Sequence, residues 1–145
     1  MGHIDYDAVS TLDALVDISD AGARAVLIRL RELLAERCPD LEERLVADGR
    51  HRKPTIALYQ GDDSVLHVYP EPGGGVGLHV ELPLRQAEMA MLDTRRFSPW
   101  LRERLEHART THNMLWVDAI LHSPGRADEL VPLIERRVDL LPRAH

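Results

Sequence analysis

The stretch that decides the fold is Ser64-Val-Leu-His-Val-Tyr-Pro-Glu-Pro-Gly-Gly-Gly-Val-Gly-Leu-His-Val-Glu-Leu-Pro83. Apolar residues alternate with polar or aromatic residues on both sides of a centre rich in proline and glycine. This pattern is typical of two strands joined by a turn. It predicts a β-hairpin in the middle of the chain, with arms at residues 65–69 and 76–82.

The two histidines of this hairpin are predicted to lie on the same side of the sheet. Side chains alternate between the two faces of a strand, so a register that buries the leucines and valines turns His67, His79 and Glu81 to the other face. If the hairpin folds about Gly73, His67 faces His79 directly, with their Cβ atoms about 4.5–5.5 Å apart. Two imidazoles and the Glu81 carboxylate then match the three ligands of a catalytic zinc or a facial iron site.

The neighbouring strands extend this face. Residues 55–59 and a Gln-Gly-Asp-Asp turn predict a strand that pairs with the first arm. The nearly all-apolar run at 114–121 predicts a central strand, in which Trp116 lies either on the same side as the histidines or in the core. We call this side the histidine face, with the candidate ligand-binding residues Tyr59, His67, Tyr69, His79, Glu81, Trp116, Asp118 and His122.

Helical patterns flank the strands. Ser19 or Asp20 caps a helix that runs to about Arg37 with leucines and valines at helical spacing. Residues 84–92 return to a helical period, and Ser98 followed by a proline begins a helix that runs to about residue 109. In the last helix, Pro132 must lie in the first turn or kink the helix.

The order of elements predicts an α+β fold. One helix, three strands, two helices, a strand and a helix form a two-layer sandwich, with an antiparallel sheet of four to five strands and helices packed on one face. Residues 41–47 fit either a further helical turn or another strand. A chain of 145 residues suits one domain, which we place at residues 19–145 after an acidic N-terminal segment at 1–18.

Composition excludes several classes of partner. A net charge of −6 repels phosphate backbones, so no nucleic-acid partner is expected, and the basic run at 50–53 is interpreted as a solvated loop. No apolar run approaches the roughly 18 residues of a membrane span. The single cysteine, Cys38, is expected to be a semi-buried thiol of a reduced, cytoplasmic protein rather than a nucleophile.

Several residues resemble the YdhG-like group of small bacterial α+β domains. They are Pro54-Thr55 entering a strand after Gly49, Gly77-Leu78-His79 in the hairpin, and Leu133-Ile134-Glu135-Arg136-Arg137 in the last helix. The likeness spans about residues 20 to 140 and departs from the group where residues 50–53 replace a short Gly-x-Pro step. It implies a fold comparable to frataxin-like domains and, for some members, a link to iron handling, but no enzyme activity.

Two functions follow from the histidine face. The first is non-catalytic binding, in which the face forms a homodimer interface, docks another chain or holds a small-molecule ligand. The second is a divalent metal site for iron or zinc, formed by His67 and His79 with Glu81 or Asp118. That metal is either stored and delivered or used to activate water for hydrolysis.

Overall fold

The computed structural model describes residues 12, 15–16, 19–48, 53–71, 74–91 and 94–141. Most of the acidic N-terminal segment, residues 50–52 of the basic run predicted to be a loop, and residues 72–73 of the predicted hairpin lie outside this part of the chain. The elements in chain order are α2 (Ala21–Arg37), β1 (Glu42–Asp48), β2 (Lys53–Gln60), β3 (Asp63–Pro70), β4 (Val76–Pro83), α3 (Leu84–Met91), η2 (Thr94–Arg96), α4 (Pro99–Glu106), β5 (Arg109–Thr111), β6 (Met114–Leu121) and α5 (Pro124–Asp139).

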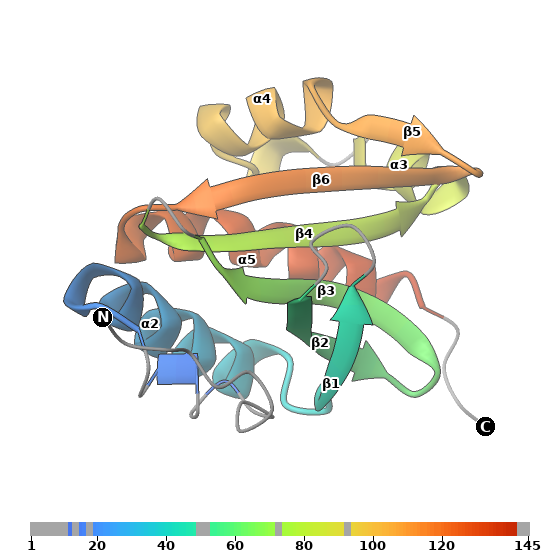
Figure 1. The fold of residues 1–145 in the computed structure, drawn as a ribbon. Helices are drawn as coiled ribbons and strands as arrows, with labels where there is room; N and C mark the ends of the chain where they lie inside the picture. The colour runs from blue at the N-terminus through green and yellow to red at the C-terminus, as the bar shows by residue number, and fades with distance from the viewer. Residues whose placement is uncertain are drawn as a thin grey trace.

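The strands form one antiparallel sheet in the order β1-β2-β3-β4-β6-β5. Figure 1 shows β4 and β6 running across the molecule, with α5 behind them and α2 at the lower left. The hairpin predicted from the sequence is confirmed as β3 and β4, and the preceding strand as β2. The fold is therefore the α+β class that the order of elements predicted.

The sheet has six strands, whereas the sequence predicted four to five. The segment left open between helix and strand is β1, which pairs with β2 along its whole length. The other addition is β5, a strand of three residues whose side chains are all exposed. Such a strand has no alternation of apolar and polar residues, which is the signal that sequence reasoning uses.

The helix α2 begins and packs as its sequence predicts. Asp20 is its N-cap, and the Asp20 carboxylate accepts a hydrogen bond from the Ala23 N–H at 2.8 Å. Its buried side chains recur at helical spacing and face the sheet and α5. An ion pair between Arg29 and Asp128, at 2.6 Å, links its outer face to α5.

The last two helices differ in detail from the sequence prediction. Helix α4 ends at Glu106, short of residue 109, because the chain turns there and enters β5. Helix α5 begins at Pro124, so Pro132 lies inside the helix rather than in its first turn. A proline there removes one backbone N–H from the helix.

One apolar core lies between the sheet and the helices. It joins residues of α2, α4 and α5 to the inward side chains of β2, β3, β4 and β6. Cys38 belongs to it as a buried free thiol. Burial, followed by the negative charges of Glu135 and Asp139, raises the pKa of this thiol to about 11, which agrees with an unreactive cysteine. No helix among the described residues has the length and apolar character needed to cross a bilayer.

Candidate functional site

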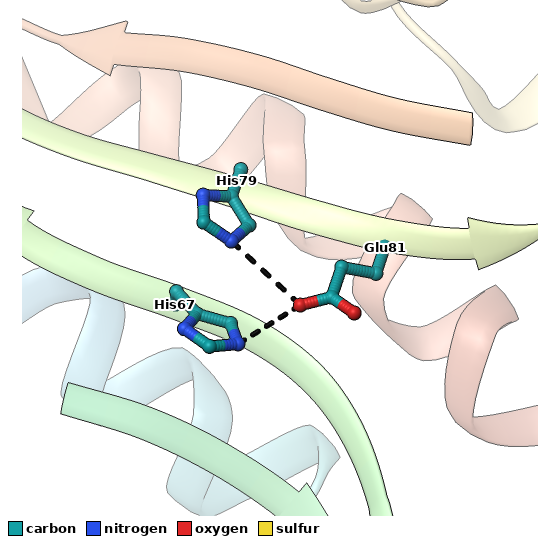
Figure 2. A group of neighbouring side chains, drawn as sticks. All are labelled: His67, His79 and Glu81. Atoms are coloured by element: carbon teal, nitrogen blue, oxygen red, sulfur yellow. Dashed lines mark ion pairs between the residues drawn. The ribbon is translucent and has the colours of Figure 1, made fainter. Parts of the chain in front are cut away.

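The register of the central strands brings the predicted cluster together. His67 of β3 pairs directly with His79 of β4. Their flanking leucines and valines are fully buried in the core on the helix side. His67, His79 and Glu81 project from the opposite face of the sheet, away from the helices (Figure 2). We call these three residues the histidine cluster.

The donor atoms of the histidine cluster converge. Glu81 Oε1 lies 2.9 Å from His67 Nε2 and 3.7 Å from His79 Nε2. One possible ligand atom from each residue lies within 4.8 Å of the other two. The two imidazole rings stack, with centroids 4.5 Å apart and planes inclined by 24°. Both Nε2 atoms face the carboxylate, and both Nδ1 atoms lie on the far side of the rings (Figure 2).

A β-bulge adds a fourth polar group that strand alternation assigns to the other face. Leu58 of β2 pairs with Leu66 of β3, but the next residue of β2, Tyr59, pairs with Ser64. The register therefore skips one residue of β3. The extra residue is Val65, so Ser64 changes sides and reaches the histidine cluster. Its hydroxyl lies 2.9 Å from His67 Nε2 and donates to Glu81 Oε1 at 3.3 Å.

A buried arginine holds the backbone at this bulge. Arg137 of α5 is 3% exposed and donates from Nη2 to the Ser64 carbonyl oxygen at 3.1 Å. Arg137 Nη1 donates a second hydrogen bond to Gln86 Oε1. Because the helix layer fixes the Ser64 backbone, the hydroxyl on the opposite face has a defined position. No short motif marks this contact, so sequence reasoning had no signal for Ser64.

The electrostatics of the cluster favour an ionised carboxylate. Burial of Glu81 by itself raises its pKa, since it penalises the charged form. Hydrogen bonds from His67 and His79, with the positive charge of the imidazoles, outweigh burial and lower the pKa of Glu81 to about 2. Glu81 is therefore a carboxylate at neutral pH, as a metal ligand must be.

Aromatic side chains shield the cluster from water. The edge of Trp116 meets His79, with ring centroids 5.4 Å apart and planes at 69°. The ring of Tyr69 lies on the other side of His79, with centroids 6.3 Å apart. It also covers Gly77, where a Cβ would clash with it. His79 is consequently only 2% exposed. Trp116 lies on the histidine face, not in the core.

Several buried polar atoms on the histidine face have no hydrogen-bond partner among the described residues. They are Thr55 Oγ1, His67 Nδ1, His79 Nδ1 and Trp116 Nε1. Thr55 shares this face with Ala57, the direct partner of His67. Buried polar groups are nearly always hydrogen-bonded, so these four atoms are the ones on the histidine face that a water or a ligand could pair.

The remaining predicted residues lie on the histidine face or near its edge, but outside the cluster. Asp118 pairs with His79 in the register, yet its carboxylate binds Arg109 at 2.9 Å, so Glu81 and not Asp118 is the third member. Tyr59 packs under the Arg44 guanidinium, 4.3 Å from the ring centroid. His122 is exposed beyond the end of β6.

The arrangement does not form a serine-hydrolase triad. Such a triad uses both nitrogens of one histidine, one toward the serine and the other toward the acid. In this cluster Ser64 and Glu81 both approach His67 Nε2, and His67 Nδ1 has no partner among the described residues. The chemistry that fits is ligation of a cation by two nitrogens and a carboxylate.

No known protein family, curated protein or solved structure matches this chain. The resemblance to YdhG-like domains therefore stays a prediction. What supports a function is the geometry of the histidine cluster, since its three side chains meet on adjacent strands at the centre of the sheet.

Proposed function

We propose that this chain is a binding protein whose histidine cluster holds a divalent metal ion, zinc or iron(II). The observation that carries the proposal is the convergence of three donor atoms, from His67, His79 and Glu81, within 4.8 Å of one another. Two imidazoles and one carboxylate, with a coordination position left open, are the ligand set of catalytic zinc and of facial iron sites.

The distances between the three donor atoms need only a small adjustment to hold a metal ion. Neighbouring ligand atoms around a tetrahedral zinc lie about 3.3–3.5 Å apart, so modest side-chain rotations bring the donors into place. Without a metal, Glu81 Oε1 lies 2.9 Å from His67 Nε2 and 3.7 Å from His79 Nε2, and these nitrogens carry protons when the imidazoles are charged. A metal must displace these protons, so its uptake releases protons and weakens as the pH falls.

The surroundings support binding but indicate a moderate affinity. Histidines that ligate a metal usually donate the other ring N–H to an acceptor, and loss of that acceptor costs about 10–100-fold in affinity. Neither Nδ1 of the cluster has such an acceptor among the described residues. The low exposure of His79 favours storage or delivery of the metal over hydrolysis, which requires substrate access to the open position.

The experiment is a titration of the purified protein with Zn²⁺ and, under anaerobic conditions, Fe²⁺. Calorimetry measures binding, and thermal unfolding measures stabilisation. At a metal concentration 100 times the dissociation constant we expect about 2.7 kcal/mol of stabilisation, or roughly 8–12 °C in Tm for a chain of this size.

The double variant His67→Ala/His79→Ala tests whether the cluster is the site. It should lose both the calorimetric signal and the shift in Tm. The matched control is His122→Ala, which removes an exposed imidazole outside the cluster and should keep both. Wild-type protein that binds neither metal, or a double variant that binds as tightly as wild type, contradicts the proposal.

A second candidate function is assembly through the histidine face, as a homodimer. The observation that favours it is Ile120, a large apolar side chain that is 45% exposed on this face. The charge-introducing variant Ile120→Asp should convert a dimer to a monomer in light scattering. A wild-type protein that is monomeric at high concentration excludes this function. A cytoplasmic location is part of both proposals, because Cys38 is a free thiol.

A further inference from the structure

A cavity lies in the helix layer, on the far side of the sheet from the histidine cluster. It has a volume of about 190 Å³ and is bordered by the end of α2, by η2 and by the second half of α5. Three of its lining residues are arginines: Arg37, Arg96 and Arg136. The buried ring of Phe97 and the ring of Pro132 supply apolar surface.

The charges around the cavity are only partly balanced, because three arginines line it together with two carboxylates, those of Glu135 and Asp139. Arg37 is neutralised by Glu135, with Nη1 and Oε1 3.1 Å apart. Arg136, in contrast, makes no ion pair or hydrogen bond with the described residues, and its Nε is buried without a partner. The position of Arg136 in the last turn of α5 offsets the negative end of the helix dipole, but leaves its N–H groups without acceptors.

We propose that this cavity binds a small organic carboxylate through Arg136. A guanidinium presents a planar fork of donors that matches the two oxygens of a carboxylate, and the Arg136 fork has no partner among the described residues. Phe97 and Pro132 offer surface to a flat apolar group attached to the carboxylate. A cavity of 190 Å³ is below the usual range for drug-sized ligands, about 300–1,000 Å³, so the ligand is small.

The probe for this proposal is benzoate, titrated at constant ionic strength into the full chain. The arginine Nε–Hε and backbone amide signals are followed by NMR. We expect saturable shifts confined to Phe97, Arg136 and their neighbours, with a dissociation constant in the millimolar range. Two companion probes separate the contribution of the negative charge from that of the apolar ring. Inorganic phosphate carries charge without an apolar group, and benzyl alcohol carries the ring without charge, so both should bind at least fivefold more weakly.

Variants assign the binding to Arg136. Arg136→Gln should weaken benzoate at least tenfold, and Arg136→Lys, which keeps the charge but loses the fork, should weaken it less. The matched control is Arg85→Gln, an exposed arginine on α3, which should bind as wild type does. Arg136→Lys keeps the positive charge at the end of α5, and Arg136 has no ion pair or hydrogen bond with the described residues, so this variant should keep the wild-type unfolding midpoint. Benzoate shifts that do not saturate, or that persist unchanged in Arg136→Gln, overturn the proposal, as does equal binding of phosphate.

Discussion

The charge of Glu81 contributes to stability in a pH range that can be measured. Its pKa is about 2 in the folded protein against an ordinary value of 4.5. A depressed carboxyl pKa means that the folded state binds the proton less well than the unfolded chain does. The contribution is therefore complete above pH 4.5 and is lost as the pH falls toward 2.

The magnitude follows from the size of the shift. One pKa unit corresponds to about 1.4 kcal/mol. Because the carboxylate keeps some contact with solvent (15% side-chain exposure), we reduce the full value for screening and expect about 2–3 kcal/mol. More than half of this is lost between pH 5 and pH 3.

The assay compares wild type with Glu81→Gln by denaturant unfolding without metal, in steps from pH 5 to pH 3. Other acidic groups titrate equally in both proteins, so their effects cancel in the difference. The stability difference between the two proteins should shrink by about 1–2 kcal/mol over this range. A difference that stays constant would show that the Glu81 pKa is ordinary and that its contacts with the histidines do not exist in solution.

Two further predictions concern Gly77 and Cys38. Gly77→Ala places a Cβ in steric clash with the Tyr69 ring and should destabilise the fold by about 1–3 kcal/mol in chemical denaturation. The control Gly125→Ala, in a helix with open space around it, should stabilise by about 0.5–1 kcal/mol. Cys38, whose thiol pKa is about 11, should react with a thiol reagent at pH 8 only as fast as the protein unfolds. Rapid reaction of the folded protein would refute its burial.

Much of the fold could be predicted because the hairpin carries a clear period of two. From Leu66 onward, that alternation fixes which side chains of β3 and β4 face the helices, and it correctly placed His67 opposite His79. It also predicted the positions of Tyr69 and Glu81 on the histidine face. The helix caps at Asp20 and Ser98 were readable for a similar reason, since both act through contacts within four residues.

The parts that could not be predicted depend on interactions between distant residues. Ser64 reaches the cluster only because a bulge inserts Val65, and the bulge is held by Arg137 from the last helix. Asp118 was the alternative to Glu81 as the third ligand, and the sequence alone does not show which partner its carboxylate has. Arg109, on a strand too short and too polar to recognise, takes that carboxylate at 2.9 Å.

Stability alone does not explain why a sheet of this kind carries two imidazoles and a carboxylate at its centre. Buried charged groups are seldom more stabilising than apolar side chains of the same volume, and the apolar core on the helix side already holds the layers together. The polar trio also leaves the Nδ1 atoms of His67 and His79 unpaired, which costs stability. Such a cost is typical of groups arranged for a ligand. The divalent metal proposed above would supply positive charge at Glu81 and bind the Nε2 atoms of His67 and His79, which face that carboxylate.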